Sequence, residues 1–380
     1  MKNPNSPYLA TVLILGGGQL AWMLVLQGHK MGLRMAVLSA SQNDPAASIA
    51  SLHFEGNYKD ADTITAAIRK CNPNAVTVES EFIPASVLDQ VFRQTGIMTG
   101  PYPKTIGIIQ DRLSQKQAIA KYGLKTADFM AVDNTEDLEA ANRKFDSSFV
   151  VKKRMGGFDG RGTTIIRNEE GYENACKVLK FKEPDNPLGL IAEELMPFEG
   201  EYALQSVRSQ FGELMHFPLV QTVQVKHQLD RLVGPIEHDG LAPLLLKLKE
   251  FTGAMNYVGA LGTELFLING EFWVNELAPR VHNSGHHTLN TCNTDQFTLH
   301  LCAILGLPLT VPYALMKFAM VNLIGTSIEG VEPPTTSSNF LWWYAKASKD
   351  MRKLGHITAV GPDMDECLAV LLQERKHMVL

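Results

Sequence analysis

The feature that most limits how this chain can fold is a short apolar run that ends in three consecutive glycines. The run covers residues 8–15, and the glycines are residues 16–18. Apolar residues at helical spacing follow, and a second apolar run occupies residues 34–38. The order strand, glycine turn, helix, strand is that of a βαβ unit, whose two strands pair in parallel. The N-terminal part is therefore expected to be an α/β domain.

A third apolar run, residues 75–78, ends at an acidic cluster that contains Glu79 and Glu81. Ligands of open parallel sheets bind at the carboxyl ends of the strands, so we expect the glycine turn and the two glutamates to face one crevice. A dinucleotide-binding oxidoreductase is the alternative. It is disfavoured because Ala21 stands where the GxGxxG pattern has its last glycine. A nicotinamide-binding assay separates the two classes, since only the oxidoreductase should bind NAD(H) tightly.

The composition argues against several classes of protein. The net charge of −5 predicts no basic surface for nucleic acid or for an anionic membrane. The five cysteines are scattered and form no CxxC pair, which argues against a disulfide framework or a structural zinc site. No apolar run reaches the length of a membrane span, and the N-terminus lacks a signal-peptide pattern. The sequence predicts a soluble, cytoplasmic protein.

The length of 380 residues favours two or three packed domains over one core. Turn-forming residues at 99–103 and a proline-containing stretch at 307–312 suggest where the chain divides. The predicted domains are residues 1–103, 104–308 and 309–380, of which the last is small and rich in β-strands.

A second glycine-rich segment, residues 156–162, follows a predicted strand at 148–152 that carries Lys152. Its four glycines allow backbone N–H groups to approach phosphate oxygens, and the lysine adds a positive charge behind them. It is not a Walker A loop, because the GKT or GKS ending is absent. The alternative is a plain hairpin turn. We interpret the segment as a phosphate-binding loop.

Two predicted strands, residues 258–268 and 272–277, carry Glu264 and Glu276, and Asn275 lies beside the second glutamate. Mg²⁺ prefers oxygen ligands and is commonly shared between carboxylates and nucleotide phosphates. If both glutamates project from one face, they supply such a site. The alternative for Glu264 alone is an exposed charge on an edge strand.

The next segment, residues 279–287, holds Arg280 and three histidines, a composition that we interpret as too polar for a core. Arg280 can bind phosphate or carboxylate through two parallel hydrogen bonds. Zinc binding by the histidines is the alternative. Another predicted strand, residues 190–195, contains Glu193 and Glu194, and could offer its backbone to adenine and a carboxylate to ribose.

Taken together, these segments resemble the carboxyaminoimidazole ribonucleotide synthetases, which are ATP-grasp enzymes of purine biosynthesis. The resemblance runs in order through most of the chain. The string NELAPRVHNSGH is highly specific to that family, whereas the glycine loop is shared more widely among ATP-grasp enzymes. The matching strings are GGGQL, TVESEFIP, QDRLSQKQ, VKKRMGGFDGRG, EELMPFEGE, YVGALGTELF, VNELAPRVHNSGHHT and RKLGHIT.

The resemblance implies an ATP-grasp fold. Its parts are an α/β, Rossmann-like (pre-ATP-grasp) domain, two α+β lobes that clamp the nucleotide, and a small C-terminal β-rich domain. It also implies Mg²⁺ at Glu264 and Glu276. The implied ATP-binding residues are Arg112, Lys152, Gly156, Gly157, Phe158, Asp159, Gly160, Arg161, Gly162, Glu193, Glu194, Leu195, Met196, Glu201, Asn275 and Glu276. The implied ribonucleotide-binding residues are Gly18, Gln19, Leu20, Glu79, Glu81, Asp159, Arg161, Asn283 and Lys353. The implied catalytic residues are Arg280, Asp159 and Arg161.

The implied reaction joins ATP, bicarbonate and aminoimidazole ribonucleotide to give the N5-carboxylated product, ADP and phosphate. Bicarbonate is a poor electrophile, so ATP must first convert it to carboxyphosphate by phosphoryl transfer. Because carboxyphosphate is short-lived in water, the loop at 156–162 is expected to close over it. The amine then needs a proton acceptor, for which Asp159 and Glu79 are the candidates. Family likeness also implies a homodimer.

Three positions depart from the family's pattern: Trp22 replaces an arginine, Phe158 a tyrosine and Gln224 a histidine. Two alternatives therefore stay open, a ligase that uses another amine and a nucleotide-binding protein without catalytic activity. The retained Lys152, Arg280 and glutamate pair favour a ligase. Measuring ADP release with and without the ribonucleotide separates these readings.

Overall fold

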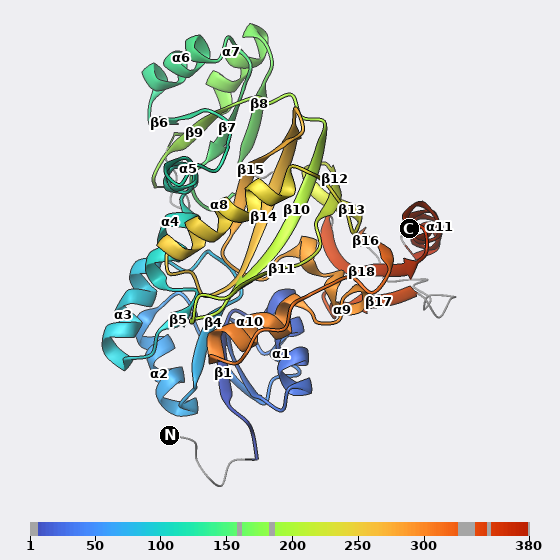
Figure 1. Cartoon of the computed structure of the whole chain (residues 1–380). Helices are drawn as coiled ribbons and strands as arrows, with labels where there is room; N and C mark the ends of the chain where they lie inside the picture. The colour runs from blue at the N-terminus through green and yellow to red at the C-terminus, as the bar shows by residue number, and fades with distance from the viewer. Residues whose placement is uncertain (1–6, 158–161, 182–186, 326–338, 348–350, 379–380) are drawn as a thin grey trace.

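The structure is a computed structural model that describes residues 7–157, 162–181, 187–325, 339–347 and 351–378. Within these ranges the strands form sheets of five, four and nine strands (Figure 1). No helix in the described part of the chain is long and apolar enough to cross a membrane. The predicted site residues that lie outside the described ranges are Phe158, Asp159, Gly160 and Arg161.

The five-stranded sheet lies in the lower part of Figure 1 and is parallel throughout. Its elements are β1 Thr11–Leu15, α1 Gln19–Lys30, β2 Arg34–Ser39, β3 Leu52–Glu55, α2 Ala61–Cys71, β4 Ala75–Val78, α3 Ala85–Thr95 and β5 Thr99–Gly100. The strand order is β3-β2-β1-β4-β5. The parallel pairing of β1 with β2 confirms the predicted βαβ unit.

Two helices, α4 Pro103–Gln110 and α5 Arg112–Lys121, connect this sheet to the rest of the chain. Asp111 lies between them and begins α5 by accepting a hydrogen bond from the amide of Leu113. The same carboxylate pairs with Arg154 at 2.7 Å. The start of α5 is thereby tied to the end of the strand that precedes the second glycine-rich segment.

The four-stranded sheet and the two helices on it form a separate lobe at the top of Figure 1, called here the upper lobe. Its elements are β6 Phe129–Val132, α6 Thr135–Lys144, β7 Phe149–Lys153, β8 Thr163–Ile166, α7 Glu169–Val178 and β9 Leu190–Glu194. The order β6-β9-β7-β8 is antiparallel. Asn134 and Asn168 cap the two helices through their side-chain oxygens.

The nine-stranded sheet carries the rest of the chain, including its last strands. Its elements are β10 Gly200–Arg208, β11 Leu214–His216, β12 Val220–Val225, β13 Gln228–Gly234, α8 Leu241–Ala254, β14 Gly259–Ile268, β15 Glu271–Ala278, η1 Asn283–Gly285, α9 Thr288–Thr291, α10 Gln296–Leu305, β16 Lys317–Gly325, β17 Asn339–Trp343, β18 Arg352–Gly361 and α11 Met364–Met378. Because β16 pairs with β13, the C-terminal strands continue this sheet. The domain limits near residues 103 and 308 stay predictions.

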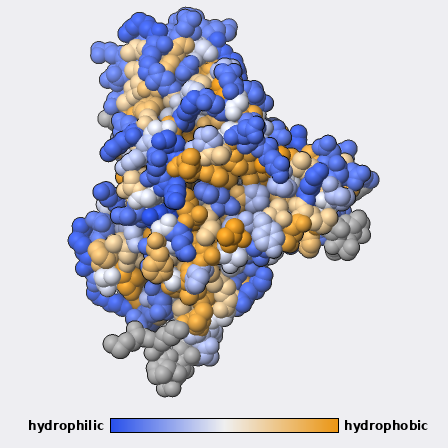
Figure 2. All heavy atoms as spheres, in the orientation of Figure 1, coloured by the Kyte–Doolittle hydropathy of each residue, from blue (hydrophilic) through white to orange (hydrophobic). Residues whose placement is uncertain are grey.

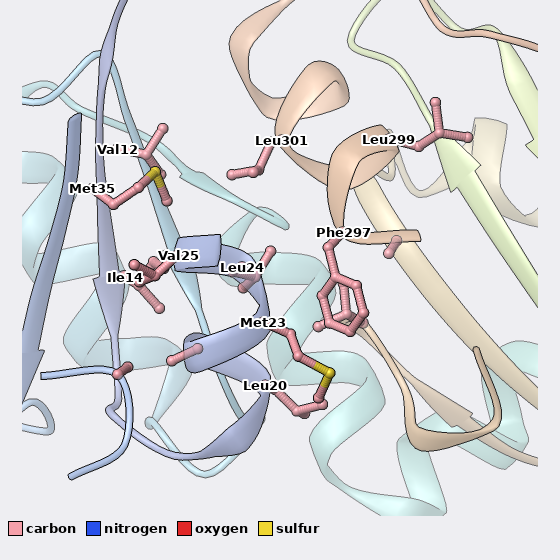
Figure 3. Packing of buried hydrophobic residues seen from close by; sticks show 14 of the residues in the cluster. Val12, Ile14, Leu20, Met23, Leu24, Val25, Met35, Phe297, Leu299 and Leu301 are labelled. Atoms are coloured by element: carbon pink, nitrogen blue, oxygen red, sulfur yellow. The ribbon is translucent and has the colours of Figure 1, made fainter. Parts of the chain in front are cut away.

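One apolar core joins the N-terminal sheet to the large sheet (Figure 3). Leu20, Met23 and Leu24 of α1 are buried against Phe297 and Leu301 of α10. Burying a large apolar side chain contributes roughly 1.5–3 kcal/mol, so a cluster of this size holds the two parts firmly together. The loops at the ends of β1 and β4 are therefore fixed relative to β14 and β15.

The β12–β13 hairpin contains a strained turn that offers a test of stability. Lys226 and His227 form its two-residue loop, and both have positive φ angles, 50° and 63°. Two-residue hairpin turns with positive φ favour Asn-Gly or Gly-Gly, because other side chains meet the backbone there. We expect His227→Gly to stabilise the protein by about 0.5–1 kcal/mol, measured as a higher urea midpoint. Val225→Gly, in the adjacent strand, is the control and should lower the midpoint. A lower midpoint for His227→Gly would contradict the strain argument.

Candidate active site

Glu264 and Glu276 lie directly opposite each other on the antiparallel strands β14 and β15. Paired residues of neighbouring strands project from the same face of a sheet, so the two carboxylates share one side, as the sequence predicts. Burial and the charge of Glu276 raise the pKa of Glu264 to about 7, although Lys152 and Arg112 oppose the rise. The carboxylate of Glu264 thus has too little positive charge near it to offset its burial, as expected of a group that binds a cation.

A cavity opens over these strands. Its polar lining includes Glu201, Thr222, Gln224, Glu264 and Asn275. Glu201 is two residues from the β10 residue that pairs with Glu264, so both carboxylates point to the same face. Burial raises the pKa of Glu201. Gln224, which departs from the family's pattern, therefore faces the same space as the acidic residues.

Lys152 of β7 reaches this region from the upper lobe. Its Nζ donates to Asn275 Oδ1 at 3.5 Å and to Glu193 Oε2 at 3.0 Å. Burial alone would raise the pKa of Glu193, but Lys116 and Lys152 lower it to about 2. The carboxylate of Glu193 thus forms ion pairs with Lys116 and Lys152. Glu194, at the end of β9, is exposed.

Arg112, the first residue of α5, connects the glutamate pair to the glycine-rich segment. Its Nη2 donates to both carboxylate oxygens of Glu276, at 3.0 and 3.2 Å, and to the carbonyl of Gly157 at 3.2 Å. The carbonyl of Gly162 accepts the amide of Lys153 at 2.8 Å. The strands on either side of the segment 156–162, β7 and β8, therefore pair as antiparallel neighbours. Its phosphate-binding role stays a proposal.

Arg280 forms a two-bonded ion pair with Glu81 of the N-terminal part. Arg280 Nη2 donates to Oε1 at 3.1 Å, and Nε donates to Oε2. The side chains are 17% and 19% exposed. Burial would raise the pKa of Glu81, but Arg280 lowers it. Gln110 of α4 donates to the carbonyl of Glu81 at 3.0 Å and so holds the loop in place. Both oxygens of this carboxylate are engaged by one guanidinium group.

Glu79 sits at the N-terminal end of α1. Its Oε2 accepts the amide of Gly18 at 2.6 Å, and the amides of Leu20 and Ala21 also stabilise its charge. Burial nevertheless raises the pKa of Glu79. A Cβ on Gly18 would lie 2.2 Å from Glu79 Oε1, which explains the glycine. The predicted meeting of the glycine turn with this glutamate is confirmed, and the carboxylate lies where helix amides converge.

The interpretation of residues 279–287 as too polar for a core is wrong for two histidines. His286 and His287 are fully buried. His286 Nδ1 lies 3.1 Å from the Tyr344 hydroxyl, and His287 Nδ1 lies 2.8 Å from Thr291 Oγ1. Burial lowers the pKa of His287 to about 3, so its ring is neutral at pH 7. Hydroxyl partners let imidazole rings pack inside, a possibility that composition does not reveal.

The remaining predicted residues lie around these groups. Leu195 and Met196 follow β9 and are partly buried, as is Asn283 at the start of η1. Lys353 lies on β18 opposite the end of β16. Burial, Arg280 and Lys353 lower the pKa of the nearby His282 to about 3, which indicates that Lys353 lies near the end of β15.

Sequence reasoning missed two lysines of this region. Lys116 is buried and pairs with Glu193 at 3.1 Å. The available signal was its position four residues after Arg112, which puts both on one face of α5. Lys346 Nζ donates to Gln19 Oε1 at 2.5 Å and so brings positive charge to the start of α1. No motif in the sequence predicts the contact between Lys346 and Gln19.

The donor set of Glu264, Glu276 and Asn275 fits Mg²⁺, which takes oxygen ligands. Across the described ranges no group of three or more His, Cys, Asp or Glu side chains could hold a metal ion. An octahedral ion bound to two carboxylates would complete its coordination with phosphate oxygens and water.

Lys152, from the sheet of the upper lobe, reaches the strand of the large sheet that carries one of the paired glutamates. This arrangement is that of an ATP-grasp ligase. Residues 117–297 match the ATP-grasp domain. Residues 9–110 match the ribonucleotide synthetase preATP-grasp domain, and residues 319–370 match the phosphoribosylaminoimidazole carboxylase C-terminal domain. The N5-carboxyaminoimidazole ribonucleotide synthase of Synechococcus elongatus is 35% identical over 91% of this chain and 88% of its own length. The chain belongs to the N5-carboxyaminoimidazole ribonucleotide synthase family.

Solved structures agree with this assignment. The Staphylococcus aureus N5-carboxyaminoimidazole synthetase complexed with ADP has a TM-score of 0.89 at 27% identity, covering 97% of this chain and 98% of that one. The Aspergillus clavatus N5-carboxyaminoimidazole synthase, in complex with ADP and 5-aminoimidazole ribonucleotide, has a TM-score of 0.85 at 26% identity with the same coverage. The predicted ATP-grasp fold with its pre-ATP-grasp and C-terminal domains is therefore confirmed.

Proposed function

We propose that this ligase carboxylates 5-aminoimidazole ribonucleotide with bicarbonate, at the expense of ATP. The products are N5-carboxyaminoimidazole ribonucleotide, ADP and phosphate, and the step belongs to purine biosynthesis. The observation that carries the proposal is the approach of Lys152 to Asn275, beside the Glu264–Glu276 pair. The names of the relatives and of the solved structures support it.

The first step is phosphoryl transfer. A bicarbonate oxygen attacks the γ-phosphorus, the bond to the leaving ADP oxygen breaks, and carboxyphosphate forms. Such reactions are accelerated by position and by charge rather than by covalent chemistry. Lys152 and Arg112 supply fixed positive charge around the triphosphate, and Arg280 stabilises the charge that develops on the transferring phosphoryl group. Mg²⁺, when bound at Glu264 and Glu276, supplies further neutralisation of the phosphate charges.

In the second step the exocyclic amine attacks the carboxyl carbon, the bond to the phosphate oxygen breaks, and the amine loses a proton. Asp159 and Glu79 remain the candidates for accepting that proton. Asp159 lies outside the described residues. The raised pKa of Glu79, caused by burial, suits a proton acceptor. Glu79 also accepts a hydrogen bond from the Gly18 amide, so a substitution there would disturb the loop as well as the proton transfer. Asp159 is therefore the first residue to test.

The ribonucleotide is proposed to lie between the start of α1 and β18. Gly18, Gln19, Leu20 and Glu79 are at one side, and Asn283 and Lys353 are at the other. Glu81 also belongs to the predicted ribonucleotide-binding residues. Its two bonds to Arg280 favour a role in orienting that arginine over direct contact with the ribonucleotide.

Lys353→Ala is expected to raise the KM for the ribonucleotide about tenfold or more while leaving the KM for ATP unchanged. The physical reason is the loss of one charge-assisted bond to an anionic substrate. Steady-state kinetics with each substrate varied in turn is the measurement. Lys317→Ala is the matched control, since Lys317 is exposed at the start of the neighbouring strand β16. A change confined to the KM for ATP would show that Lys353 is misplaced.

The proposed reaction is tested by ADP release from the purified protein with bicarbonate, with and without aminoimidazole ribonucleotide. Stimulation by the ribonucleotide supports the proposal. ADP release only with a different amine would establish a ligase with another amine substrate. Trp22 and Gln224, which depart from the family's pattern, are the reason to test for it. Absence of ADP release under every condition would favour a nucleotide-binding protein without catalytic activity.

A homodimer located in the cytoplasm completes the proposal. Figure 2 shows hydrophobic residues gathered over the middle of the face shown, around α8, where Leu246 is 65% exposed. Such a surface suits contact with a second copy. All five cysteines are free thiols, which suits a reducing compartment. Sedimentation velocity measures the oligomeric state.

A further inference from the structure

Two lysines share one carboxylate oxygen at the junction of the upper lobe with α5. Glu193 Oε2 lies 3.1 Å from Lys116 Nζ and 3.0 Å from Lys152 Nζ. The side chains of Lys116 and Glu193 are only 2% and 4% exposed, whereas that of Lys152 is 15% exposed. Lys152 therefore faces the site, and Lys116 lies behind the carboxylate, away from solvent.

Lys116 is held in place by further bonds. Its Nζ donates to Thr126 Oγ1 at 2.7 Å, and Thr126 Oγ1 donates to the carbonyl of Val274 at 2.7 Å. Val274 precedes Asn275 and Glu276 on β15. The chain of contacts runs from the carboxylate-bearing strand through Lys116 and Glu193 to Lys152. Lys116 thus occupies a fixed position between the two halves of the site.

The charges of the three residues decide what Lys116 does. Glu193 and Lys152 alone sum to zero, and a lysine paired so closely with a carboxylate attracts a phosphate weakly. Burial lowers the pKa of Lys116, but the adjacent Glu193 carboxylate opposes that shift. With Lys116 protonated, the trio has a net charge of +1. We propose that Lys116 is a charge-balancing residue that neutralises Glu193, so that the charge of Lys152 remains available to the phosphates of the nucleotide. The inference rests on the proposed function only in taking an adenine nucleotide as the ligand.

The test is the affinity for ADP in the presence of Mg²⁺, measured by isothermal titration calorimetry. This readout requires neither bicarbonate nor ribonucleotide. Failure of the carboxylation reaction is therefore distinguishable from failure of the inference. K116M keeps the length of the side chain and removes its charge, and we expect it to weaken ADP binding about tenfold or more. K125M is the matched control, because Lys125 is an exposed lysine that pairs with Glu271 of the same strand β15. It should bind ADP like the wild type.

The double variant K116M/E193Q separates charge balance from packing. It removes one positive and one negative charge, so Lys152 again provides a net charge of +1. We expect its ADP affinity to return to within about threefold of the wild-type value, because the buried Glu193 carboxylate is bonded to the two lysines and so affects the nucleotide through them, while its backbone is unchanged. If Lys116 served only to fill space, the double variant would bind ADP no better than K116M. That result, or unchanged affinity in K116M, overturns the proposal. If K116M does not fold, the affinity of the double variant decides alone, and a loss of more than about tenfold there counts against the proposal.

Discussion

Glu276→Gln is expected to reduce ADP release roughly a hundredfold to a thousandfold. The substitution keeps the size of the side chain and removes the charge that a cation requires. It also weakens the hold on Arg112, whose Nη2 bonds to both oxygens of this carboxylate. Circular dichroism and the thermal midpoint should stay close to those of the wild type, because Glu276 is only partly buried and its side chain contributes little to the core.

Glu271→Gln is the control for that experiment. Glu271 begins the same strand, is 57% exposed and pairs with Lys125 on the surface. Exposed ion pairs contribute little, so its loss should change neither turnover nor stability appreciably. Near-normal turnover in Glu276→Gln, under conditions where the wild type is active, would refute the assignment of the glutamate pair to the metal.

The second large effect is expected at the Arg280–Glu81 pair. Arg280→Lys loses the planar fork that meets Glu81 with two bonds, and we expect kcat to fall about a hundredfold. Glu81→Gln keeps one acceptor but loses the charge that orients the guanidinium, and kcat should fall about tenfold or more. The KM for ATP should change little in both, because the guanidinium is proposed to act on charge that develops in the transition state.

The double variant Glu81→Gln/Arg280→Lys tests whether the two residues act as one unit. Residues that work through each other give effects that do not add, so the double variant should resemble Arg280→Lys alone. Arg93→Lys is the control, since Arg93 forms an exposed pair with Asp89, with side chains 68% and 57% exposed. Additive losses in the double variant would show that Glu81 acts independently, as in direct contact with the ribonucleotide.

Much of the secondary structure follows from local patterns in the sequence. The run at residues 75–78 becomes β4, and the strands that bear Glu264 and Glu276 agree with prediction to within one residue at each end. These segments are rich in apolar residues and bounded by turn residues, such as Asn269 and Gly270 between β14 and β15. The local sequence pattern is sufficient to predict an element when its apolar residues and its turn residues indicate the same bounds.

Contacts between distant residues could not be predicted in the same way. The sharing of Glu193 by Lys116 and Lys152 depends on how α5 meets the upper lobe. The burial of His286 depends on Tyr344, which is 58 residues away in the sequence. Each of these pairs gains its stability only once the sheets are assembled, so neither leaves a periodic signal in the chain.

The shared apolar core of α1 and α10 has a consequence for how the molecule can be divided. A fragment that ended after β5 would carry an uncovered face formed by Leu20, Met23 and Leu24, and the remainder would expose Phe297. Exposed faces of this kind lead to aggregation rather than to two working parts. The N-terminal sheet and the large sheet therefore depend on one shared core, and neither can be produced or exchanged without the other.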